Sequence, residues 1–196
     1  MKLEYWRHYA QGRVWRALGR PDAACSAFCA AMAIDPLHTG AVRHLAAMAA
    51  EREQWEVAAA WFARVVDLAP DDADAWFNLG FVHERAGNAP AAISAFTEAL
   101  KHKPSLDRAR YGMGLAHARL GQHRAAAAAF GDCVDMQPLH GEAYYQWGMA
   151  LHYADCPQDV RRVIERLAQF EPQRARQLLL DTQHTDLLHL IPELPI

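Results

Sequence analysis

Apolar residues recur every three or four positions through most of the chain, which is the spacing of one face of an α-helix. The periodic stretches are about 12 residues long and come in pairs, and a short turn containing Gly, Asn, Asp or Pro splits each pair. The stretch WFNLG at residues 76–80 is the clearest example of such a helix face. The pattern therefore predicts an all-α protein built from helix-turn-helix units.

Five prolines mark one fixed interval along the chain. They follow one another at a spacing of 34 residues: Pro36, Pro70, Pro104, Pro138 and Pro172. Because proline ends a helix, we interpret each one as the stop of a second helix. Aligned on them, the chain divides without insertion into five blocks: 5–38, 39–72, 73–106, 107–140 and 141–174. We expect five repeats within residues 1–174 and a capping helix with a tail in 175–196.

Other positions repeat in the same register. A small residue lies 24 before each proline: Gly12, Ala46, Gly80, Gly114 and Gly148. A large apolar residue lies 8 before it: Phe28, Phe62, Phe96, Phe130 and Ile164. We expect the glycines to let two helix backbones approach closely, with an alanine of the second helix facing them, and the phenylalanines to fill the gap between units. Gly19, Gly87 and Gly121 stand where first helices end, and glycine favours the left-handed cap conformation needed there.

These positions resemble the tetratricopeptide repeat, whose signature is W-x2-L-G-x2-Y followed by A, F and P at fixed offsets. Block 73–106 matches best, with His83 in place of the tyrosine; it carries Trp76, Leu79, Gly80, Ala92, Phe96, Ala99 and Pro104. Block 141–174 departs most, with Val160 and Ile164 in the alanine and phenylalanine positions. The resemblance implies a right-handed α-solenoid of five units with a C-terminal capping helix.

The resemblance also implies that the first helix of each unit lines a concave groove that binds a partner peptide. Carried onto this register, the candidate groove residues are Tyr9, Arg13, Arg16, Arg43, Phe77, Asn78, Phe81, Arg85, Tyr111, Leu115, Arg119, Tyr145, Met149 and Tyr153. Aromatic residues and arginine are enriched at binding hot spots. The alternative is that the aromatic residues pack against the next repeat or the C-terminal tail. Arg13, Arg16 and Arg43 form a cationic cluster in the first two repeats. This cluster would either pair with an acidic segment or a free C-terminal carboxylate, or form a solvated face.

A subset of the family binds peptide C-termini with a carboxylate clamp of Lys and Asn. Here the corresponding places hold Tyr9, Arg13, Arg43, His44 and Phe77, and Asn78 is the only asparagine of that layer. A chaperone-tail adaptor of the clamp kind is therefore disfavoured.

The two ends of a repeat array lack a neighbour. We expect a capping helix over roughly 175–183, where Leu178, Leu179 and Leu180 would cover the last repeat. The tail after it, with Leu187, Leu188, Leu190 and Ile191 ahead of Pro192 and Pro195, either folds back onto the array, which we favour, or remains available to a partner. Only four residues precede the first block, so self-association through that end is a further expectation.

Composition narrows the class of protein. Apolar residues make up 52% of the chain, enough for a core, and the net charge of -3 argues against a dedicated nucleic-acid binder. The start has no apolar run typical of a secretory signal, and no stretch reaches the roughly 18 apolar residues of a membrane span. Four cysteines without a CxxC pair suggest neither a disulfide framework nor a zinc ribbon. We expect a cytoplasmic location.

Candidate chemistry is sparse. His83 and His117 occupy one register position in neighbouring repeats, about 10 Å apart, too far to share a zinc ion. Cys25 and Cys29 are interpreted as packing residues, with Cys25 toward the core and Cys29 on the convex side. Cys133 is expected to be buried and Cys156 to be the most exposed thiol. No GxSxG, HExxH, P-loop or GxGxxG motif occurs, so we expect neither an enzyme nor a cofactor or metal.

The sequence thus predicts a scaffold, adaptor or assembly chaperone that holds a partner protein or peptide, with an acidic or apolar segment, in a concave groove. Two alternatives stay open: a self-assembling structural protein, and a stable non-catalytic regulatory subunit of an enzyme complex.

Overall fold

The computed structural model describes residues 2–190 of the chain. Every regular element in that part is helical. The α-helices are α1 Lys2–Ala17, α2 Pro21–Ile34, α3 Thr39–Glu51, α4 Trp55–Leu68, α5 Ala73–Arg85, α6 Ala89–His102, α7 Asp107–Arg119, α8 His123–Met136, α9 Gly141–Tyr153, α10 Pro157–Ala168 and α11 Pro172–Asp181. A 3-10 helix, η1, follows at Thr185–Leu190.

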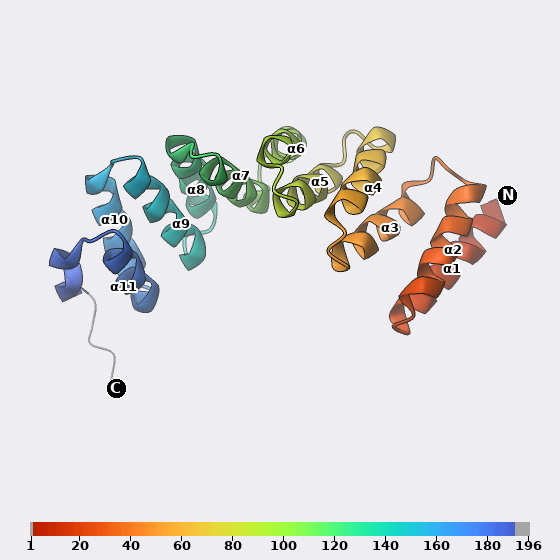
Figure 1. Ribbon diagram of the computed structural model, residues 1–196, viewed down its shortest axis with the longest axis horizontal. Helices are drawn as coiled ribbons and strands as arrows, with labels where there is room; N and C mark the ends of the chain where they lie inside the picture. The colour runs from red at the N-terminus through yellow and green to blue at the C-terminus, as the bar shows by residue number, and fades with distance from the viewer. Residues whose placement is uncertain (1, 191–196) are drawn as a thin grey trace. The chain divides into compact units, whose positions relative to one another are not determined.

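The chain forms two compact units, Met1–Pro104 with α1 to α6 and Ser105–Ile196 with α7 to η1. Within each unit, consecutive helices pack against each other in pairs, as Figure 1 shows. The predicted all-α fold of five helix-turn-helix units and a capping helix is confirmed.

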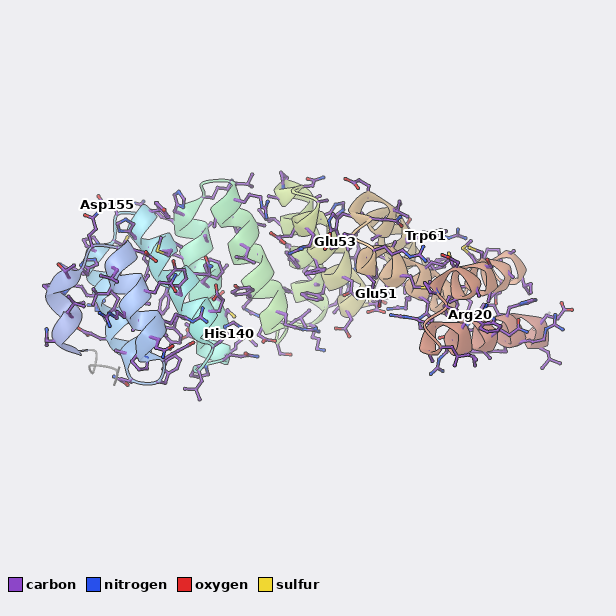
Figure 2. The ribbon with its side chains drawn as sticks, turned by 60° about the horizontal axis from the view of Figure 1, so that its bottom comes forward. Arg20, Glu51, Glu53, Trp61, His140 and Asp155 are labelled. Atoms are coloured by element: carbon purple, nitrogen blue, oxygen red, sulfur yellow. The ribbon has the colours of Figure 1, made fainter. Side chains whose placement is uncertain are left out.

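The turns inside the pairs follow the predicted cap. Gly19, Gly87 and Gly121 all adopt positive φ, between 67° and 80°. The same register position holds Glu53 and Asp155 in the other two pairs, with φ of 57° and 58°. Both residues lie in turns and are labelled in Figure 2. A backbone N–H just after each of these residues donates to a carbonyl of the preceding helix, as in the 2.8 Å bond from Asn88 to His83. The cap geometry therefore persists where glycine is absent.

The structural reason for glycine in the middle of the first helices differs from the one expected. A Cβ placed on Gly80 would lie 2.6 Å from the ring of Phe96, and Gly12 and Gly114 meet Phe28 and Phe130 in the same way. The glycine thus makes room for the phenylalanine ring of its own repeat rather than for a second backbone with its alanine. Phe96 is buried directly against the first helix, so in these three repeats the ring fills the interior of its own helix pair.

Replacing Gly80 by alanine is expected to lower the free energy of unfolding by about 1–2 kcal/mol. The added methyl group overpacks against Phe96 by more than the roughly 1 kcal/mol that alanine gains in helix propensity. Urea titration followed by far-UV circular dichroism measures the change.

The matched control for this substitution is Gly131→Ala in α8, where a Cβ would lie 3.5 Å from the Trp147 ring, an ordinary contact. There the same change is expected to stabilise the protein by up to about 1 kcal/mol. Equal effects at the two sites would refute the steric role of Phe96.

The C-terminal end differs from the register in one respect. First helices begin at 39, 73, 107 and 141, but α11 begins at Pro172, three residues before the next position of that series. Pro172 therefore starts a helix, whereas the four earlier prolines follow one. The capping helix occupies Pro172–Asp181 rather than 175–183. Leu178 and Leu179 are fully buried in the core of the last pair as predicted, but the prediction was wrong for Leu180, which is 53% exposed because it lies on the outer face of α11.

The segment after α11 folds back onto its own unit. Leu187 of η1 is buried in the core formed by α8 to α11, and Asp186 forms an ion pair with Arg161 of α10. This agrees with the favoured expectation for residues 185–190. Ile191, Pro192 and Pro195 lie outside the described residues.

Candidate functional site

A polar network joins the inner faces of α1 and α3 in the first unit. The hydroxyl of Tyr9 lies 3.2 Å from Nε2 of His44, and a guanidinium nitrogen of Arg16 lies 3.0 Å from Nδ1 of the same ring. Because arginine only donates, Nδ1 must accept, so Nε2 carries the proton and donates to Tyr9. Arg16 also forms an ion pair with Glu51, which lies at the end of α3 and is labelled in Figure 2.

This network holds His44 neutral. Burial lowers the pKa of His44, and the positive charges of Arg16 and Arg13 lower it further, against a smaller opposing effect of Glu51. The ring also stacks on Phe28 of α2 at 4.5 Å between centroids. A proton on Nδ1 would face the Arg16 guanidinium, so the neutral form is the one the site accommodates.

Acidification is therefore expected to destabilise the first unit. With a folded-state pKa below the ordinary 6.5 of histidine, the unfolded chain binds the proton more readily. The contribution of His44 is complete above about pH 6.5 and is lost as pH falls through the lowered pKa. Urea titrations from about pH 7 to about pH 5 should show the decline, and His44→Gln should reduce it.

His83, whose pKa is also lowered by burial, contributes in the same direction and is measured separately with His83→Gln. A pH profile that is identical in the wild type and in His44→Gln would show that His44 titrates freely.

A second ion pair joins α3 to α5. Arg43 binds the carboxylate of Asp72, which also caps α5 by accepting from the backbone N–H of Ala75 at 2.9 Å. Burial raises the pKa of Asp72, but the hydrogen bonds from Ala75 and Arg43 outweigh it and leave the pKa below its usual value. The carboxylate therefore stays charged and fixes the Arg43 side chain.

Between these pairs lies an open hollow of about 540 Å³. Helices α3, α4 and α5 contribute its walls: Arg43, His44, Ala47, Ala50, Glu51, Trp55, Phe62, Asn78, Phe81 and Val82. The floor is mainly apolar. Phe81 is 43% exposed, and its ring meets that of Trp55 edge to face at 6.5 Å. The Arg85 guanidinium lies 5.2 Å from the centre of the Trp55 ring, a cation–π contact.

The predicted groove residues of the first unit separate into two groups. Arg43, Asn78 and Phe81 line the hollow together. Tyr9 and Phe77 instead contact the core: Tyr9 packs on Phe28, and the Phe77 ring lies 5.9 Å from that of Phe96. Arg16 and Arg43, which the sequence suggested as a cationic cluster, are both neutralised by carboxylates.

The predicted groove residues of the second unit are mostly partly buried. Tyr111, Leu115, Tyr145 and Met149 pack against the core of that unit. The hydroxyl of Tyr145 donates to Asp181 of the capping helix at 2.8 Å; burial, together with this carboxylate, raises the pKa of Tyr145 to about 12. These contacts match the packing alternative for that side of the protein.

Tyr153 and Arg119 are the exposed members of the set in the second unit. The Tyr153 side chain is 62% exposed, with its ring 5.1 Å from that of His123. A larger hollow of about 660 Å³ in this unit, lined by α9 and α10 residues such as Trp147 and Val163, contains none of the predicted residues. Its rim carries both signs of charge, from Asp159 and Glu165 to Arg162 and Arg166, so it favours no partner charge.

Sequence reasoning missed Trp55 and gave His44 and Glu51 no role in the site. Trp55 begins α4 just after the turn, in a register position outside the first-helix columns. The role of Glu51 could have been predicted from the sequence, because Glu51 lies 35 residues after Arg16, which is one repeat plus one residue. Charged pairs at that separation lie on adjacent first helices.

The cysteines and histidines offer no further site. Cys133 is buried as expected, and burial raises the pKa of its thiol to about 11. Cys29 is the exposed thiol and Cys156 is only half-exposed, which reverses the order expected for Cys156. Within residues 2–190, no three metal-ligating side chains gather closely enough to hold an ion. None of the helices in this range has the length and apolar character to cross a membrane.

Comparison with solved structures shows the same fold. MamA aligns with a TM-score of 0.83 at 21% identity, over 90% of this chain and 96% of that one. MamA from Desulfovibrio magneticus RS-1, residues 41 to the end, aligns with a TM-score of 0.78 at 16% identity, over 87% and 96%. YrrB, described as a TPR protein with an unusual peptide-binding site, aligns at 0.78 and 16%, over 90% of both chains. No curated protein matches the sequence.

Sequence models of the tetratricopeptide repeat match residues 45–113 in one case and residues 9–73 and 111–152 in another. The second alone covers more than half of the chain, and its matches fall on the helix pairs described above. The protein is therefore a member of the tetratricopeptide repeat family.

Proposed function

We propose that the protein is a scaffold or adaptor that binds a partner peptide in the hollow of its first unit. The observation that carries this proposal is the exposed Phe81 ring beside Trp55, in an apolar hollow bordered by Asn78 and fixed ion pairs. An exposed aromatic ring in a concave apolar site is typical of a surface that receives a partner side chain. The family is one of protein-interaction scaffolds, generally without catalytic activity.

The chemistry of the walls supports a peptide as the ligand. Asn78 offers both a donor and an acceptor to a peptide backbone, while Phe81 and Trp55 offer apolar contact to a side chain. Because Arg43 and Arg16 are held by carboxylates, the walls are ordered before any partner arrives, which lowers the entropy lost on binding. The similarity to YrrB, described as having a peptide-binding site, points the same way.

Self-assembly by stacking a helix pair on α1 is not proposed. At the register position of Arg7, the other units hold fully buried alanines such as Ala41, Ala75 and Ala143. Stacking another unit on α1 in the same way would bury the Arg7 guanidinium, which is expensive without a partner charge. Leu3 and Val14 are exposed on α1, but Arg7 lies on the surface that such stacking uses.

Selection of a phage-displayed library of random peptides on the full chain tests the proposal. Enriched peptides are expected to bind Phe81→Ala at least about tenfold more weakly than the wild type, as at an interface hot spot. Leu37→Ala, which removes an exposed side chain from the turn between α2 and α3, is the matched control and should change nothing. No enrichment, or equal binding to Phe81→Ala, would refute the proposed site.

A further inference from the structure

The cations around the hollow are not equivalent. Arg16 and Arg43 are neutralised by Glu51 and Asp72. In the part of the chain that the structure describes, by contrast, no carboxylate lies within ion-pair distance of Arg13 or Arg85. Both of these arginine side chains are exposed. Arg13 and Arg85 therefore contribute two positive charges beside the hollow that no carboxylate of the described residues pairs with.

The repeat register places these two arginines at opposite borders of the hollow. Arg13 of α1 corresponds to Ala47 of α3 and Phe81 of α5, which both line it. Its charge also acts on His44, a wall residue. Arg85 belongs to the last turn of α5 and lies over the Trp55 ring on the other wall. The apolar floor thus lies between one free cation on α1 and another on α5.

We propose that the hollow selects a peptide with an apolar side chain flanked by two carboxylates, one for Arg13 and one for Arg85. This inference rests on the proposed function and specifies its ligand. Helices α1, α3 and α5 succeed one another without packing as closely as the helices of one pair, so at least about 10 Å separates each from the next and at least about 20 Å separates α1 from α5. An extended chain rises about 3.3 Å per residue, so the two carboxylates belong about six to eight residues apart.

The guanidinium groups suit this role. Each presents several N–H donors to a carboxylate, and Arg85 lies over the Trp55 ring, 5.2 Å from its centre. Lysine-rich or neutral segments would leave both cations unpaired in the complex. The floor between them, formed by Trp55, Phe81 and Val82, accepts a leucine-sized or aromatic side chain.

A synthetic peptide array tests the inference. Each peptide carries one leucine centred between two glutamates in a serine–glycine background, and the spacing of the glutamates varies from two to nine residues. Binding by the wild-type chain is expected to peak at a spacing of about six to eight. Exchanging either glutamate for glutamine in the best peptide should weaken binding by about two- to fivefold, as for exposed ion pairs, and added salt should reduce this difference.

The variants Arg13→Gln and Arg85→Gln show which glutamate of the peptide contacts which arginine. Each variant should abolish the effect of one glutamate and leave the effect of the other, while Arg52→Gln, on the same unit but paired with Asp22, should change neither. Circular dichroism of each variant confirms that the fold is retained.

The failures of the two proposals differ. Binding that depends on the leucine and on Phe81 but is equal for glutamate and glutamine would overturn the carboxylate inference and leave the proposed function intact. The carboxylate inference is likewise overturned if no array peptide binds while the phage selection succeeds. A phage selection without peptides that depend on Phe81 would overturn the proposed function itself.

Discussion

Replacement of Phe96 by alanine is expected to lower the free energy of unfolding by about 3–5 kcal/mol, the range for deleting a buried aromatic ring. The Phe96 side chain is only 1% exposed and rests on the bare Cα of Gly80. Because Gly80 has no side chain, it offers no atoms to fill the space that the ring leaves. The cavity should therefore remain open, and the loss should fall toward the upper end of the range.

Phe81→Ala provides the matched control for this loss. It removes the same ring from the same unit, but at a position that is 43% exposed, where the cost should be clearly smaller, about 1–2 kcal/mol. Chemical denaturation of both variants, followed by far-UV circular dichroism, measures the difference. A loss below about 1 kcal/mol in Phe96→Ala would mean that the repeat interior repacks, and it would refute the rigid ring-on-glycine contact.

The sequence was sufficient for the architecture because the helix stops recur at 34 residues. Local periodicity and the 34-residue register can be read from the sequence. They determine the helix pairs, the caps at Gly19 and Gly87, and the burial of Leu178. The role of the mid-helix glycines was not predictable in the same way. It depends on the direction in which the Phe96 ring enters the pair, and that direction is decided by packing between two helices.

The groove was predicted less completely, since its charges pair across repeats. Arg43 pairs with Asp72 and Arg16 pairs with Glu51, over separations of 29 and 35 residues. Two arginines of the predicted cationic cluster are therefore neutralised by carboxylates of the protein itself. Pro172 shows a related ambiguity: proline both ends a helix and suits the first position of one. The 34-residue register alone predicted that Pro172 ends a helix, whereas in the structure Pro172 begins α11.

Leu178→Ala in the capping helix is expected to lower the free energy of unfolding of the second unit by about 2–5 kcal/mol. The Leu178 side chain is fully buried, and its methyl groups occupy the space that a Cβ on Gly148 would take. In the repeats with Gly80 and Gly114, a phenylalanine ring covers the glycine. The last repeat has Ile164 at the phenylalanine position, and Leu178 of the capping helix covers Gly148 instead.

Leu180→Ala, two residues further along α11, makes the same chemical change at a side chain that is 53% exposed, and its effect should stay within about 0.5 kcal/mol. The two variants therefore share the change in helix propensity and differ in burial. Loss of Leu178 should also loosen η1, because Leu187 packs in the same core, and hydrogen exchange of the η1 amides should accelerate. Equal stability of the two variants would mean that α11 does not hold the last pair closed.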